Sequence, residues 1–89
     1  MVTSIILFCV ERQSINDVAE KLADMGQVSE VYSVSGNYDL VAIVRVKDND
    51  DLADFVTNDL VNVEGILETD TMLAFKAYSR HDLESMFSV

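Results

Sequence analysis

Two stretches of the chain are apolar on both faces of an extended backbone. They cover residues 4–10 and 38–46 and are short enough to be strands. Apolar runs of about four to eight residues are typical of strands that are covered on both sides. A more polar stretch over residues 28–35 suits the edge of a sheet, and a longer one follows over residues 66–78. The pattern therefore predicts four strands.

Two segments between these strands have the spacing of amphipathic helices. The first ends at Gly26 and carries apolar residues three or four positions apart: Ile15, Val18, Ala19, Leu22 and Met25. The second follows a run of polar residues that can cap a helix, and its apolar side consists of Leu52, Phe55, Val56 and Leu60. Each helix thus connects two predicted strands.

The order strand–helix–strand–strand–helix–strand predicts an α+β fold. The arrangement it favours is a ferredoxin-like βαββαβ sandwich, in which two helices cover one face of a four-stranded antiparallel sheet. Right-handed crossovers place the first and third strands in the centre, and these are the two most apolar ones. The turn between the second and third strands, at residues 35–38, reads as a tight primed hairpin. We assign residues 1–78 to this domain and residues 79–89 to a C-terminal tail with the pattern of a short helix.

The second face of the predicted sheet is also apolar. Two helices cover only one side, and a monomer would then show alternating apolar and polar residues along each strand. Residues 5–10, 40–44 and 72–75 show almost no such alternation. A bare apolar face of this size is unusual in a monomer. We therefore expect a homodimer that packs sheet against sheet.

The charge of the chain limits its partners. Sixteen acidic and six basic residues give a net charge of -10, and the basic residues are scattered. Direct binding to DNA or to an anionic membrane is therefore not expected, since both need clustered Lys and Arg. A single cysteine, Cys9, lies in an apolar run and is expected to be buried in the core as a small hydrophobic residue. Because it has no partner for an internal disulfide, a reducing compartment is expected for the protein. With no leader or membrane-spanning run, the chain is predicted to be cytoplasmic.

The sequence gives no support for catalysis, a metal or a cofactor. The acidic run at residues 48–51 lacks the turn glycine of a calcium loop and reads as a helix start. His81 is the only histidine and lies in the polar tail, so no metal set or catalytic triad can be assembled. Glu68 and Asp70 share a strand face but have no accompanying nucleophile. We expect no catalytic residue.

Two polar segments offer groups that a small zwitterion needs. The hairpin tip combines a glycine, an aromatic ring and a carboxylate at residues 36–39, and four hydrogen-bonding side chains interrupt an apolar strand at residues 68–71. Carboxylates can accept hydrogen bonds from the ammonium group of a ligand, while threonine hydroxyls and free backbone amides can donate hydrogen bonds to its carboxylate. Ordinary turn chemistry and a solvated strand start explain the same residues. Spacing alone leaves both interpretations open.

The same two segments resemble a known family. The hairpin Val34-Ser35-Gly36-Asn37-Tyr38-Asp39, followed about thirty residues later by Thr69-Asp70-Thr71, is similar to the effector-binding (RAM) domain of the Lrp/AsnC, or feast/famine, transcription regulators. The resemblance covers residues 1–78. Family regulators also carry a helix-turn-helix domain, whereas this chain begins at the first strand, so it resembles a stand-alone version.

The resemblance implies a function and a set of ligand-binding residues. A domain of this family senses an amino acid or similar metabolite, dimerises through its sheets, and often assembles into a ring of dimers. Matched onto this chain, the implied ligand-binding residues are Gly36, Asn37, Tyr38, Asp39, Thr69, Asp70 and Thr71. Without its own helix-turn-helix, such a chain would act through effector-dependent oligomerisation and by modulating full-length regulators.

Two other classes share the predicted strand order. An ACT-like domain would be an amino-acid-binding regulatory subunit of a metabolic enzyme, but residues 11–14 lack the glycine that usually follows its first strand. A ferredoxin-like dimeric enzyme would need a histidine or comparable acid–base group beneath the sheet, and none is visible.

Overall fold

The four predicted strands form one antiparallel sheet. The computed structural model describes residues 1–78 and residue 80; the predicted tail, 79–89, lies outside these residues apart from Arg80. The strand order is β2-β3-β1-β4, so the two most apolar strands are central, as predicted. The strands are β1 (Val2–Val10), β2 (Val28–Ser33), β3 (Leu40–Val46) and β4 (Ile66–Leu73).

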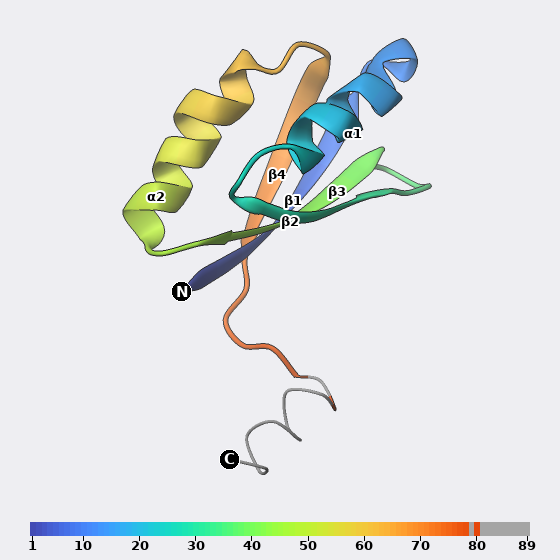
Figure 1. The fold of residues 1–89 in the computed structure, drawn as a ribbon. Coiled ribbons are helices and arrows are strands. Elements are labelled where there is room, and N and C mark those ends of the chain that lie inside the picture. The colour runs from blue at the N-terminus through green and yellow to red at the C-terminus, as the bar shows by residue number, and fades with distance from the viewer. Residues whose placement is uncertain (79, 81–89) are drawn as a thin grey trace.

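Both helices lie on one face of this sheet (Figure 1). A 3-10 turn, Arg12–Ser14, leads into α1 (Ile15–Ala23). The second helical segment starts with α2 (Asn49–Asp54), where the Asp48 side chain accepts a hydrogen bond from the Asp51 amide. It continues through a π-helical turn, Phe55–Asp59, and a 3-10 turn, Leu60–Asn62. The α+β, ferredoxin-like arrangement is confirmed.

The core lies between the helices and the sheet. Alternate residues of β1 and β3 are buried, as expected for strands whose side chains point to opposite faces in turn. They meet apolar residues of both helical segments. The largest fully buried side chains are Phe8, Phe55, Ile6, Leu22, Leu40, Val18 and Val44. Ser4 is the buried polar residue on this face, and its hydroxyl donates to the Met72 carbonyl oxygen at 2.7 Å.

The structure corrects the predicted ends of all four strands, with β1 beginning at Val2 instead of residue 4, and the turn between two of them. β2 and β3 separate after the pair Ser33 and Leu40, so the connection is longer than a two-residue turn. The Val34 amide donates to the Asp39 carbonyl oxygen, so four residues rather than two lie inside the connection, and Gly36 among them has a positive φ of +113°. β4 ends at Leu73 rather than at residue 78. Beyond that point, one further hydrogen bond joins the Ala74 amide to Thr3, and the chain then extends away from the body (Figure 1).

The face of the sheet opposite the helices is open. Its central positions are Ile5 and Leu7 on β1 and Val41 and Ile43 on β3, all half-buried in a single chain. The register pairs Ile5 with Ile43 and with Met72, whose side chain is 44% exposed. The apolar second face predicted from the sequence is therefore present, and we call it the open face.

Candidate ligand-binding site

The connection between β2 and β3, residues 34–39, is tied to the sheet through Asp39. The Val34 amide donates to the Asp39 carbonyl oxygen at 3.0 Å, and the Asp39 amide donates to the Phe8 carbonyl oxygen at 2.8 Å. The Asp39 carboxylate also accepts a hydrogen bond from the Val10 amide, with Oδ2 2.8 Å from that nitrogen. One side chain thus fixes the end of the connection to the end of β1.

The same connection reaches β4 through Tyr38. The Tyr38 hydroxyl donates to Oδ2 of Asp70 at 3.1 Å, which joins two of the predicted ligand-binding segments. The Cys9 thiol lies beside them and donates to the Asn37 carbonyl oxygen at 3.5 Å. The structure therefore brings four predicted residues, 37–39 and 70, to one end of the open face, which we call the hairpin end.

Two residues at the hairpin end were not assigned to the site from the sequence. Cys9 was expected in the core, but its side chain is half-buried and lies on the open face. Glu68 pairs with Cys9 across β1 and β4 and therefore lies on the same face. Only the register between these two strands places them beside Tyr38, and the sequence carries no signal for that register.

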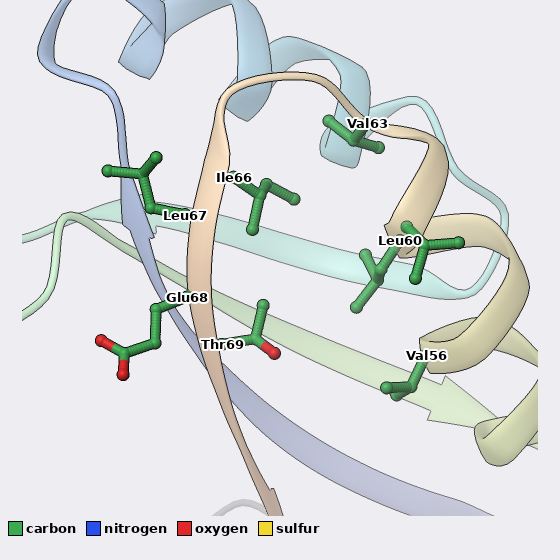
Figure 2. Close-up of a pocket in the computed structure, with 8 residues that line it drawn as sticks. Val56, Leu60, Val63, Ile66, Leu67, Glu68 and Thr69 are labelled. Carbon is green, nitrogen blue, oxygen red and sulfur yellow. The ribbon is translucent and has the colours of Figure 1, made fainter.

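Thr69 and Thr71 lie on the other side of β4. They pair with Phe8 and Ile6, whose side chains are buried beneath the helices. Figure 2 shows Thr69 pointing toward the second helical segment, while Glu68 points away from it. Between that segment and β4 is a groove of about 290 Å³, lined by Val56, Leu60, Val61, Val63, Ile66, Leu67, Glu68 and Thr69. In a single chain, the two threonines do not share the hairpin end with Asp70.

The hairpin end is an acidic environment. The pKa of the Cys9 thiol is raised, first by desolvation and then by the negative charges of Glu68 and Asp39. The pKa of Tyr38 is raised because its hydroxyl donates to Asp70 and because a phenolate would be repelled by that carboxylate. Both groups are therefore protonated at neutral pH. The cluster offers carboxylate acceptors of the kind that an ammonium group needs.

Donors are available in the connection itself. Gly36 takes a backbone conformation that side chains rarely adopt, and no other residue comes near the space that a Cβ would fill. Within residues 1–78, the amides of Gly36, Asn37 and Tyr38 make no hydrogen bond to another backbone group. These amides can donate to the carboxylate of a small ligand.

The Tyr38–Asp70 contact can be tested by titration. We expect Asp70→Asn to lower the pKa of Tyr38 toward the ordinary value of 10.0, because the negative charge that disfavours the phenolate is removed. In the parent protein, protonated Tyr38 contributes fully to the free energy of unfolding when the pH is below the ordinary tyrosine pKa of 10.0. This contribution is lost as the pH rises through the raised pKa of the folded state. Phenolate absorbance would be followed above about pH 9, with Tyr38→Phe identifying the signal. Identical curves for parent and Asp70→Asn would contradict the contact.

Comparison with known proteins identifies the family. Residues 3–83 match the model of the Lrp/AsnC ligand binding domain. The chain belongs to the Lrp/AsnC ligand-binding domain family. This membership favours the regulator interpretation over the ACT-like and enzymatic alternatives.

Several relatives cover most of the chain. It is 33% identical over 78 residues to the HTH-type transcriptional regulator FL11 of Pyrococcus furiosus, covering 86% of this chain and 50% of that protein. TTHA0845 from Thermus thermophilus is 45% identical with a TM-score of 0.83, covering 90% of this chain and all of that one. The L-Met complex of the regulator NMB0573 from Neisseria meningitidis shares the fold, with 15% identity, a TM-score of 0.80 and coverage of 89% and 53%.

The Lrp/AsnC membership settles the broad class of the chain. This is a regulatory ligand-binding domain related to transcription regulators and not an enzyme, as expected from the sequence. The chain spans about half the length of the curated relatives it matches. Among the described residues, no helix has the length and apolar character needed to span a membrane.

Proposed function

We propose that this domain senses an amino acid or a similar small metabolite at the hairpin end. The observation that carries the proposal is the Tyr38–Asp70 hydrogen bond, which joins the two segments that the family resemblance implies in ligand binding. Carboxylates there can accept from an ammonium group, and the amides of residues 36–38 can donate to a carboxylate. The Neisseria regulator of the same fold was solved with L-methionine, which is consistent with a ligand of this class.

The proposed response to the ligand is a change in association between subunits. Two copies would pack through the open face, since a single chain leaves Ile5, Ile43 and Met72 without a covering layer. Dimers would then meet near the hairpin end, where Thr69 and Thr71 of one subunit can complete the site with residues 36–39 and 70 of another. Mixed assembly with full-length regulators would carry the signal to DNA. Direct DNA contact by these 89 residues, which have a net charge of -10, is not part of the proposal.

A thermal-shift screen of the twenty amino acids tests the proposed function. A ligand that binds only the folded protein stabilises it by about 2.7 kcal/mol at a hundred times its Kd, so a preferred amino acid should raise the Tm measurably. Calorimetric titration would then give the Kd, and sedimentation with and without the ligand would show its effect on assembly. The D-enantiomer of the preferred amino acid is the matched control. The absence of any shift or heat for all twenty would refute amino acid sensing.

A further inference from the structure

The segment that follows β4 carries two exposed aromatic side chains. Residues 74–78, which we call the arm, contain Phe75, which is 96% exposed, and Tyr78, which is 78% exposed. A hydrogen bond from the Ala74 amide to the Thr3 carbonyl oxygen ties the arm to the sheet, and beyond it the chain runs away from the body (Figure 1). Large aromatic side chains are frequent anchors of protein interfaces. The arm is therefore suited to contact another molecule.

The two aromatic side chains of the arm differ in their surroundings. The Lys76 ammonium group lies over the Tyr78 ring, with Nζ 5.1 Å from the ring centroid. A cation in this position is attracted by the face of the ring. Phe75, by contrast, is almost fully exposed to solvent. Phe75 is therefore the apolar anchor of the arm, and Lys76 supplies its charge.

The groove between the second helical segment and β4 has the size and chemistry to hold one aromatic side chain. Figure 2 shows Ile66 of β4 on one side of it and Leu60 and Val63 on the other. Its volume of about 290 Å³ is at the lower end of the roughly 300–1,000 Å³ typical of ligand pockets, so a side chain fits and a helix does not. Two further residues that line it, Val61 and Leu67, are 69% and 66% exposed, so apolar surface is left bare.

The arm of one chain does not reach its own groove. The groove lies along the start of β4, at residues 66–69, and the arm leaves from the other end of this strand. Six residues lead from Thr69 to Phe75, which corresponds to about 20 Å at roughly 3.3 Å per residue, and the chain continues away from the groove (Figure 1). The groove also lies on the helix side, so a copy bound at the open face would leave it free. An arm that fills it must come from a further copy.

We propose that the arm of one copy docks in the groove of another, with Phe75 against Leu60 and Ile66. The charges agree with this placement, because Glu68 is exposed and lines the groove, while Lys76 directly follows the anchor. Opposite charges steer two surfaces together and disfavour other placements. In a chain of net charge -10, acidic surface is common, so the apolar groove selects the position of the arm and the charges support it.

The proposed contact extends assembly beyond a pair of copies. Arm and groove are different surfaces, so a copy that has used its arm still offers a free groove to the next one. Thr69, which is implied in ligand binding, also forms part of the groove wall. A ligand that contacts Thr69 would therefore change the surface that receives Phe75. Docking of the arm itself needs no ligand, so it can be tested separately from amino acid sensing.

Removing the anchor and closing the groove should each weaken the contact. Phe75→Ser removes the apolar side chain, and Val61→Lys places at the groove a charge of the same sign as Lys76. Each variant should raise the concentration at which assemblies larger than a pair form by at least about tenfold, since buried aromatic anchors dominate the stability of interfaces. An equimolar mixture of the two variants should restore these assemblies, because intact arms then meet intact grooves. Sedimentation velocity without added ligand measures the effect.

Tyr78→Ser is the matched control within the arm. It removes an aromatic side chain three residues from the anchor, so this variant should assemble as the parent does. Circular dichroism would confirm that every variant is folded. Equal losses of assembly in Tyr78→Ser and Phe75→Ser would contradict the role of Phe75 as the anchor.

A photo-cross-link locates the contact directly. Phe75 would be replaced by p-benzoylphenylalanine, which keeps an aromatic side chain at this position, and mass spectrometry of mixed isotope-labelled and unlabelled protein would identify peptides joined between copies. Position 75 of one copy should be joined to residues 56–69 of another. The same probe in place of Lys21, an exposed residue of α1, should not reach that segment. Cross-links from position 75 only to β1 and β3, or a parent that never exceeds a pair, would overturn the proposal.

Discussion

Replacing Ile43 by Glu should convert a dimer into a monomer or make the chain insoluble. Ile43 lies at the centre of the open face, paired with Ile5 and half-buried even in a single chain. A carboxylate buried there between two subunits would have no partner, and an unpaired buried charge costs several kcal/mol. Because a two-fold interface contains the substitution twice, the loss of association should exceed about a hundredfold. Sedimentation equilibrium at micromolar concentration measures it.

A matched substitution outside the open face controls for the added charge. Val61 is 69% exposed and lines the groove on the helix side, so Val61→Glu should leave the dimer intact. Leu73 would be a poor choice for the open face, since it pairs with Ser4, which is buried beneath the helices. Parent-like sedimentation of Ile43→Glu would show that the open face is not the interface.

The second large effect is expected at Asp39. Asp39→Ala should weaken binding of the preferred amino acid at least about tenfold, because a charge-assisted hydrogen bond is worth about 1.5–3 kcal/mol. It should also lower the free energy of unfolding by about 1–3 kcal/mol. The reason is that the Val10 amide, which now donates to the Asp39 carboxylate at 2.8 Å, would lose its acceptor. Calorimetric titration and urea denaturation measure the two effects separately.

Asp39→Asn distinguishes the two roles of this side chain. The amide oxygen of asparagine can still accept from Val10, so most of the stability should remain. The negative charge is lost, so the affinity for the ammonium group of the ligand should fall nearly as far as in the alanine variant. If Asp39→Asn retained parental affinity, Asp39 would be a structural residue and the ligand site would lie elsewhere.

The fold could be predicted because its main determinants are local. Apolar runs such as residues 4–10 define central strands, and helical spacing from Ile15 to Leu22 defines a covering helix. Handedness rules then leave few strand orders. The ends of the strands were harder to predict, because they depend on partners. The pairing of β4 ends with Leu73 opposite Ser4, close to the start of β1, and residues 74–78 look no different in sequence from the strand before them.

The candidate site could be predicted only in part, for a similar reason. Tyr38 and Asp70 were both predicted from the motif, and the structure joins them by a hydrogen bond. Successive side chains of β4 point to opposite faces of the sheet, so Asp70 lies on one face and Thr69 and Thr71 lie on the other. The order of residues in the motif does not by itself show this separation. The neighbourhood of Cys9 and Glu68 depends on the pairing of two strands that are far apart in the sequence, and so it needed the structure.

The irregular pairing near the start of β4 has a consequence for solubility. β4 is an outer strand, and the unpaired backbone groups of such a strand can recruit another chain and start aggregation. The register shifts beside Leu67, where one extra residue interrupts the pairing with β1, and exposed Glu68 and Asp70 follow directly. Interruptions and charges of this kind protect an edge from uncontrolled strand addition. Variants that change these carboxylates to alter ligand preference would therefore also weaken the protection of the protein against fibre formation.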